Sequence, residues 1–168
     1  LSTLSRAERG VADAAEEISM DELVQDLFKE YAPQAEAKGL RFNLDVEPQL
    51  GEVNASRLYL KELLQNFITN AIKYTKEGEV TLIAKKLTGS KLELAVKDTG
   101  IGISKSDQGH IFEKFWRSED YRTRETGGTG LGLYVVRKLA KKLGVDIQMT
   151  SRLNHGSTFK FTINTAKK

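Results

Sequence analysis

The sequence has no cysteine, only two prolines and a single tryptophan, and it contains no long hydrophobic run. The absence of cysteine excludes disulfides, thiolate zinc sites and cysteine nucleophiles. No stretch approaches the roughly 20 apolar residues of a membrane-spanning helix, and the N-terminus lacks the layout of a signal peptide. We therefore expect a soluble, cytoplasmic domain without membrane contact.

A large excess of one charge is also missing. The net charge is +3 over 168 residues, and the lysines are interspersed with acidic residues. The densest basic cluster, residues 138–142, falls at the predicted end of a helix, where cations favour the helix dipole. We therefore expect no nucleic-acid partner. The length predicts one domain with a short appendage.

The most informative stretch is residues 57–73, RLYLKELLQNFITNAIK. At about 100° per residue, its apolar side chains share one broad arc, which predicts a helix packed on a core. These side chains are Leu60, Leu63, Leu64, Phe67, Ile68 and Ala71.

The other side of this predicted helix carries a polar row. Glu62, Asn66 and Asn70 recur every four residues, and Lys73 returns to the same line. Asparagine is unfavourable in mid-helix, so two of them call for a reason. Amide oxygens suit a hard cation such as Mg²⁺, lysine suits phosphate, and glutamate can act as a base. The row therefore indicates either a binding site or a solvated outer face.

Hydrophobic periodicity predicts the remaining elements. Helices are expected at residues 18–38, 57–73 and 130–143, and strands at 40–46, 79–86, 91–98, 145–150 and 158–164. Ser19 is expected to cap the first helix, and Asn54 or Ser56 the second. Five strands in hairpin-rich order with three helices predict a two-layer α/β (α+β) sandwich. Its mixed, mostly antiparallel five-stranded sheet is covered on one face by helices.

Residues outside these elements receive other interpretations. Residues 1–10 look like the end of a helix, residues 11–17 like a polar linker, and the chain through Pro48 and Gly51 like a loop. The stretch 103–128 is long, polar and punctuated by glycine, which is typical of a functional or mobile loop. We interpret it as a lid.

Two glycine-rich turns complete the candidate site. Asp98-Thr99-Gly100-Ile101-Gly102 ends a strand, where a carboxylate can accept a hydrogen bond from an exocyclic amine and Gly100 and Gly102 let a flat base approach. An ordinary turn is the alternative. Residues 127–132, GGTGLG, precede a helix, whose free N–H groups bind phosphate, although a flexible hinge has the same composition.

Four ordered segments resemble the N, G1, F and G2 boxes of sensor histidine kinases. They are residues 62–75, 98–102, 111–117 and 128–133, and Gly156-Ser157-Thr158-Phe159 resembles the family's last motif. The resemblance covers residues 18–165. It implies the ATP-binding (Bergerat) fold shared with gyrase-type and Hsp90-type ATPases, with a mobile ATP lid.

The resemblance also implies roles for individual residues. Adenine would bind Asp98, Mg²⁺ would bind Asn66 with Asn70 nearby, and Glu62 would assist phosphoryl transfer. The remaining nucleotide contacts would come from Lys73, Tyr74, Gly100, Gly102, Arg117, Gly128, Thr129, Gly130, Leu131, Gly132 and Thr158, with Thr158 beneath the adenine. Most of these groups supply positive potential or amide donors, as phosphoryl transfer requires.

The activity implied is transfer of the γ-phosphoryl group of ATP to a histidine on a separate dimerisation domain in two-component signalling. A response-regulator receiver domain would be the further partner. His110 and His155 do not stand in the family's acceptor motif, so we expect both at the surface.

The resemblance also divides the chain. Residues 1–17 would be the end of the acceptor hairpin plus a linker, and residues 18–165 the catalytic domain. We expect this fragment to be monomeric, and its parent protein could be anchored in a membrane. The alternatives are an ATPase clamp of the gyrase or Hsp90 kind and a non-catalytic nucleotide-sensing module.

Overall fold

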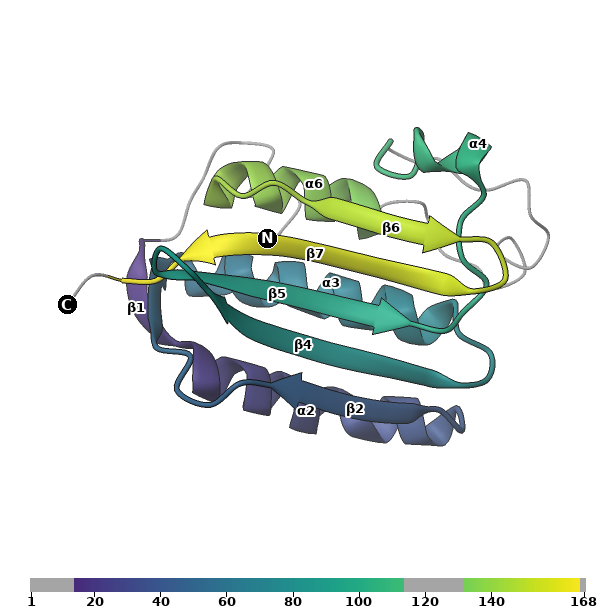
Figure 1. Cartoon of the computed structure of the whole chain (residues 1–168), viewed down its shortest axis with the longest axis horizontal. Coiled ribbons are helices and arrows are strands. Elements are labelled where there is room, and N and C mark those ends of the chain that lie inside the picture. Colours follow the sequence, from purple (N-terminus) through teal and green to yellow (C-terminus); the bar gives the residue numbers. More distant parts are fainter. Residues whose placement is uncertain (1–13, 114–131, 167–168) are drawn as a thin grey trace.

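A five-stranded sheet forms the centre of the structure, a computed structural model that describes residues 14–113 and 132–166 (Figure 1). Its strands are β2 (Arg41–Val46), β4 (Glu79–Leu87), β5 (Lys91–Asp98), β6 (Gln148–Arg152) and β7 (Gly156–Asn164). Their order across the sheet is β2-β4-β5-β7-β6. Because β2 is parallel to β4 and every other pair is antiparallel, the predicted mixed, mostly antiparallel sheet is confirmed.

Three long helices cover one face of this sheet. They are α2 (Met20–Ala37), α3 (Arg57–Lys73) and α6 (Gly132–Leu143), and all lie behind the sheet in Figure 1. Helix α3 is central, because it packs against both α2 and α6 and against β4 and β5. The predicted two-layer sandwich is confirmed.

Two of the helices have the capping residues that the sequence predicts. The Ser19 side chain accepts a hydrogen bond from Glu22 N at 3.3 Å and caps α2. Ser56, one of the two predicted candidates, caps α3 by accepting from Tyr59 N at 3.3 Å. Each cap satisfies an N–H group that lacks a partner within the helix.

The core lies between α3 and the sheet. All six apolar residues predicted for the inner arc of α3 are buried, and none is more than 5% exposed. The ring of Phe67 lies 5.7 Å from that of Phe159 and 6.1 Å from that of Phe161, centroid to centroid. Since burying a large apolar side chain contributes about 2 kcal/mol, this arc fixes α3 on the sheet.

A second, two-stranded sheet was not predicted. Strand β1 (Glu16–Ser19) pairs antiparallel with β3 (Glu52–Ala55). The linker expected over residues 11–17 and the start of the helix expected over residues 18–38 are therefore wrong where β1 lies. The loop expected through Pro48 and Gly51 is confirmed, but it ends at β3. Each strand is four residues long and buries one apolar side chain, Ile18 or Val53, so neither shows a clear period of two.

The predicted lid is described only at its start. After β5 the chain forms a one-turn helix, α4 (Lys105–Gln108), capped by Ser104. Residues 114–128 of the stretch, and the mobility expected of it, lie outside the described residues.

Candidate functional site

The site begins at the C-terminal end of β5, where Asp98 lies next to the first residues of β7 in the ladder. Its side chain is 8% exposed on the face that the helices cover. Oδ1 accepts hydrogen bonds from the backbone N–H groups of Gly100 at 2.9 Å and Ser157 at 3.3 Å. In the described part of the chain no donor bonds Oδ2. One carboxylate oxygen is therefore held, and the other is available for an external donor.

The electrostatics of Asp98 are unusual for an aspartate. Burial raises its pKa to about 6, and the hydrogen bonds from Gly100 and Ser157 partly oppose this rise. At neutral pH the carboxyl group is mostly ionised, and no cation within the described residues forms an ion pair with it. A ligand N–H group that donates to Oδ2 would relieve this cost.

Gly100 and Gly102 are required by the protein's own packing. A Cβ at Gly100 would collide with the carbonyl oxygen of Tyr74 and approach the Thr75 hydroxyl to 2.8 Å. Gly102 has φ +69° and faces the carbonyl of Arg152. The turn packs tightly on the end of α3 and on the β6–β7 hairpin, which is reason enough for glycine at both positions, and the close approach of a base stays a prediction.

The polar row of α3 reaches this turn. Glu62, Asn66, Asn70 and Lys73 are half-buried on successive turns of the helix. The carbonyl oxygen of Tyr74, the residue that ends α3, accepts a hydrogen bond from Ile101 N at 3.1 Å. The C-terminal end of the row, at Lys73, therefore lies next to the turn that follows Asp98.

Two polar atoms near this junction lack partners. Asn70 Nδ2 and Thr75 Oγ1 are buried and have no hydrogen-bond partner within the described residues. A buried polar atom without a partner costs about 1–3 kcal/mol. Thr75 is 0% exposed, and no role was predicted for it. A polar ligand beside Asp98 would have donors and acceptors to satisfy here.

The metal prediction can be tested on Asn66. Its amide nitrogen donates to the carbonyl oxygen of Glu62 at 2.8 Å, which leaves the amide oxygen as its acceptor group. Among residues 14–113 and 132–166 there is no cluster of three His, Cys, Asp or Glu side chains suited to a metal. The residues fit Mg²⁺ only as an ion that takes most of its ligands from phosphates and water, which is its usual habit.

Lys73 and Tyr74 lie together at the end of the row. The Lys73 ammonium is 5.3 Å from the centroid of the Tyr74 ring, a cation–π contact. This contact holds a positive charge and an aromatic ring side by side at the junction with the Asp98 turn.

Thr158 was predicted to lie beneath the adenine beside Asp98, and this is wrong because Thr158 lies on the other face of the sheet. Thr158 pairs with Lys97, whereas Ser157 pairs with Asp98, and paired residues share a face. Thr158 therefore lies opposite the helices, and the 7% exposed Ser157 occupies the place beside Asp98. The signal was in the sequence, because the core residues Phe159 and Phe161 place Ser157 on their side by alternation.

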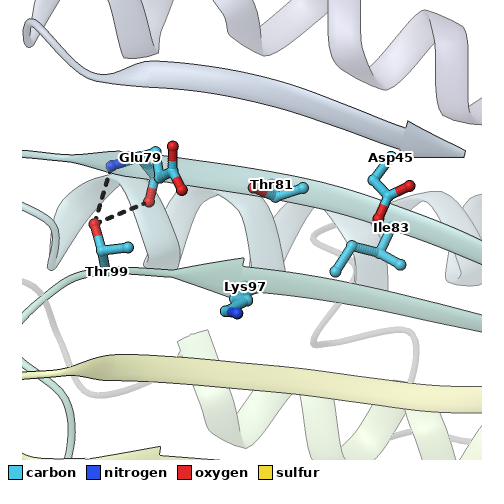
Figure 2. Close-up of a pocket in the computed structure, with 6 residues that line it drawn as sticks. All are labelled: Asp45, Glu79, Thr81, Ile83, Lys97 and Thr99. Atoms are coloured by element: carbon cyan, nitrogen blue, oxygen red, sulfur yellow. Dashed lines mark hydrogen bonds between the residues drawn. The ribbon is translucent and has the colours of Figure 1, made fainter.

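The open face of the sheet carries a separate hollow of about 220 Å³ (Figure 2). It is lined by Asp45, Glu79, Thr81, Ile83, Lys97 and Thr99. The Thr99 hydroxyl accepts from Glu79 N at 3.0 Å there, so this side chain turns away from the Asp98 carboxylate. The hollow is distinct from the candidate site.

Several predicted residues remain to be placed. Arg117, Gly128, Thr129, Gly130 and Leu131 lie outside the described residues, and Gly132 is the first residue of α6. At the start of the F box, Ile111 is buried and the Phe112 ring meets that of Phe159 edge-on at 6.4 Å. His110 and His155 are exposed, as predicted.

The two-layer sandwich, with the buried Asp98 at the end of β5, is the fold expected of the ATP-binding domains that the four sequence boxes resemble. The chain belongs to the family described as "Histidine kinase-, DNA gyrase B-, and HSP90-like ATPase", whose family model matches residues 55–167.

Its relatives include sensor histidine kinases. The aerobic respiration control sensor protein ArcB of Escherichia coli (strain K12) is 38% identical over 149 residues, which cover 88% of this chain but 19% of ArcB. In the crystal structure of full-length ShkA in complex with AMPPNP, 27% of residues are identical, with a TM-score of 0.84 over 99% of this chain and 35% of ShkA. The catalytic domain of histidine kinase ThkA shares the fold, with 24% identity and a TM-score of 0.77 over 91% of this chain and 97% of that one.

No helix within the described residues has the length and apolar character needed to cross a membrane.

Proposed function

We propose that this domain binds Mg-ATP beside Asp98 and donates the γ-phosphoryl group to a histidine of a separate acceptor domain. The observation that carries the proposal is Asp98 itself. It is a buried carboxylate whose Oδ1 is held by two backbone N–H groups and whose Oδ2 is available for an exocyclic amine. Since ATP is the substrate, we place the domain in the cytoplasm.

The polar row of α3 supplies the groups for the triphosphate. The amide oxygen of Asn66 would hold Mg²⁺, with Asn70 beside it. Lys73 would contact a phosphate, and Tyr74 would line the nucleotide. Bound Mg²⁺ would neutralise charge on the β- and γ-phosphates. Arg117 and the amides of Gly128, Thr129, Gly130, Leu131 and Gly132 are proposed to complete the phosphate contacts.

In the transfer itself, an imidazole nitrogen of the acceptor histidine attacks the γ-phosphorus. The bond from phosphorus to the β–γ bridging oxygen breaks, and ADP leaves with its electron pair. The N–H proton of the acceptor passes to the carboxylate of Glu62, which is half-buried on the row one turn before Asn66. The acceptor hairpin and a response-regulator receiver are the partners that this reaction requires.

Calorimetry and a transfer assay test this function. We expect ATP and ADP to bind with micromolar or weaker Kd in the presence of Mg²⁺. The variant Asp98→Asn, which presents an amide NH₂ group where the adenine amine must donate, should bind at least about tenfold more weakly. The exposed-site variant Asp146→Asn is the matched control. Wild-type protein that shows no heat with millimolar nucleotide would refute the proposal.

Addition of the acceptor hairpin and receiver domain separates the kinase from its alternatives. A kinase leaves acid-labile phosphate on the acceptor, whereas an ATPase clamp releases only inorganic phosphate. Glu62→Gln should slow transfer by at least about a hundredfold while nucleotide Kd changes little, because general-base catalysis contributes about 10²–10⁴. Unchanged transfer in Glu62→Gln would exclude Glu62 as the base.

A further inference from the structure

A chain of hydrogen bonds joins the Asp98 site to the residues that follow it. The hydroxyl oxygens of Ser151 on β6 and Ser157 on β7 lie 2.7 Å apart. Ser151 Oγ also accepts from Ile103 N at 2.8 Å and donates to the carbonyl oxygen of Gly156 at 3.1 Å. Ser151 thus has three partners although its hydroxyl has a single proton.

The number of protons fixes the direction of these bonds. A serine hydroxyl donates once and accepts twice. The carbonyl oxygen of Gly156 can only accept, so it takes the Ser151 proton. The two acceptor positions of Ser151 Oγ are then filled by Ile103 N–H and by the hydroxyl of Ser157. Only this arrangement makes all three contacts of Ser151 Oγ hydrogen bonds at the same time.

The consequence concerns Ser157. Its proton points toward Ser151, so the lone pairs of its oxygen are the groups left for the space beside Asp98. Ser157 is 7% exposed and donates its backbone N–H to Asp98 Oδ1 at 3.3 Å, which places it at the site. Within the described residues, neither Asp98 Oδ2 nor the lone pairs of Ser157 Oγ receive a hydrogen bond, so both oxygens remain as acceptors at this end of the sheet.

We propose that Ser151 is a positioning residue that determines which base the site accepts, by holding the Ser157 proton away from the pocket. This inference rests on the proposed function. An edge that offers only acceptors suits an amino group, which carries two hydrogens. It opposes a carbonyl oxygen in the same place, as in hypoxanthine, because two acceptors would face each other without a proton.

Gln108 of α4 holds the segments that carry Ile103 and Ser151 together. Gln108 Nε2 donates to the carbonyl oxygens of Ile103 at 2.9 Å and Ser151 at 3.2 Å. Gly102 faces Arg152 so closely that a Cβ would not fit between them. These contacts hold Ile103 N–H on Ser151 Oγ, so that one acceptor position of Ser151 is always filled.

The test compares ADP with IDP, whose base has a carbonyl oxygen in place of the amine. In wild-type protein we expect ADP to bind more tightly by at least about thirtyfold, since an unpaired polar group is left with IDP. Ser151→Ala frees the Ser157 hydroxyl to rotate and donate to that carbonyl. The ratio of the two Kd values, measured by calorimetry, should fall at least about fivefold.

Two matched variants make the result specific. Ser151→Thr keeps a hydroxyl and should restore the ratio. Thr150→Ala removes a hydroxyl one residue away, on the opposite face of β6, and should leave the ratio unchanged. Amide hydrogen exchange at Ile103 reports on the network directly, and it should accelerate in Ser151→Ala only. Loss of protection without a change in the ratio would show a merely structural role and would overturn the proposal.

The experiment distinguishes failure of the proposed ATP-binding function from failure of the proposed role of Ser151. If wild-type protein binds neither nucleotide, the proposed function falls, and the role of Ser151 falls with it. If wild-type protein binds ADP normally and Ser151→Ala keeps the full preference over IDP, only the role of Ser151 is overturned.

Discussion

At the scale of single residues, the buried Asp98 carboxylate lowers the stability of the fold while serving the proposed binding of adenine. The rise of its pKa from the ordinary 3.8 to about 6 means that the folded protein resists ionisation of this carboxyl. Below pH 3.8 the group is neutral in both states and costs nothing. The cost grows as pH rises through this window and is complete above pH 6, where it amounts to about 3 kcal/mol.

Asp98→Asn should therefore stabilise the domain at neutral pH. The asparagine Oδ1 can still accept from Gly100 and Ser157, but it carries no charge. We expect its free energy of unfolding, measured in urea, to exceed that of wild type by a margin that grows by about 2.4 kcal/mol between pH 4 and pH 7. The exposed Asp146→Asn is the control. Parallel pH profiles for wild type and Asp98→Asn would contradict this assignment.

The face of β7 gives a second prediction at this scale. Ser157→Ala should weaken ADP binding about fivefold, because an acceptor beside Asp98 is lost. Thr158→Val should change Kd less than twofold, since Thr158 lies on the opposite face with Lys97. Calorimetry on both variants checks the register, and the reverse order of effects would show that the strand faces the other way.

The residue scale also shows where sequence reasoning reaches its limit. The buried arc of α3, the Ser56 cap and the position of Asp98 follow from local pattern and were predicted correctly. The prediction for Thr158 followed the motif Gly156-Ser157-Thr158-Phe159, whereas the alternation of side chains along β7 places Thr158 on the face away from Asp98. The Thr75 hydroxyl, which has no partner within the described residues, faces the Gly100 turn about 25 positions away in sequence, and the Ser151–Ser157 contact depends on the register of the β6–β7 hairpin, so no local pattern reveals either.

At the scale of elements, helix α3 receives a cap from another helix. Lys38, the residue that ends α2, donates from Nζ to the carbonyl oxygens of Ile72 at 2.7 Å and Lys73 at 2.8 Å. The last carbonyls of a helix lack partners within it, and a cation there also favours the helix dipole. Lys38 thereby fixes the turn of α3 that carries Lys73 and meets the Asp98 turn.

Lys38→Met should lower the free energy of unfolding by about 1–3 kcal/mol, because two carbonyls lose a charged donor. We also expect weaker nucleotide binding, since Lys73 is no longer held. Lys29→Met, an exposed change in the same helix, should stay within about 0.5 kcal/mol of wild type. Urea denaturation and calorimetry measure both effects. Equal stability of the two variants would show that the Lys38 bonds do not form in solution.

The same scale explains which elements the sequence reveals. Strands β4, β5 and β7 and the three long helices bury apolar side chains at regular spacing, so their patterns were sufficient. Strands β2 and β6 carry only half-buried and exposed residues, and β6 begins three residues after the start of the strand expected at 145–150. Strands β1 and β3 are stabilised by each other across more than thirty intervening residues, and half of β1 is glutamate. Such strands exist because of tertiary pairing, which local propensity does not encode.

At the scale of the whole molecule, the β1–β3 sheet and the candidate site lie at opposite ends of the sandwich (Figure 1). The small sheet joins three distant parts of the chain, because Ala166 N also donates to Glu52 O at 2.6 Å. Ile18 is 1% exposed, so β1 closes this end of the core. The site end depends instead on the junction of α3, β5 and β7.

This separation predicts that stability and binding can be changed independently. A chain that starts at Met20 lacks β1, the buried Ile18 and the Ser19 cap, and it should lose about 3–5 kcal/mol relative to one that starts at Ala14. Ile18→Ala alone should account for about 2–4 kcal/mol of this loss, and Glu16→Ala for less than about 0.5. At urea concentrations too low to unfold the shortened chain, its Kd for ADP should match that of the longer chain within about twofold. The reason is that β1 pairs only with β3, and no residue of the Asp98 site belongs to that pair of strands. If the shortened chain is as fully folded as the longer one but binds ADP tenfold more weakly, the two ends of the sandwich are energetically coupled, and the β1–β3 sheet helps to shape the site.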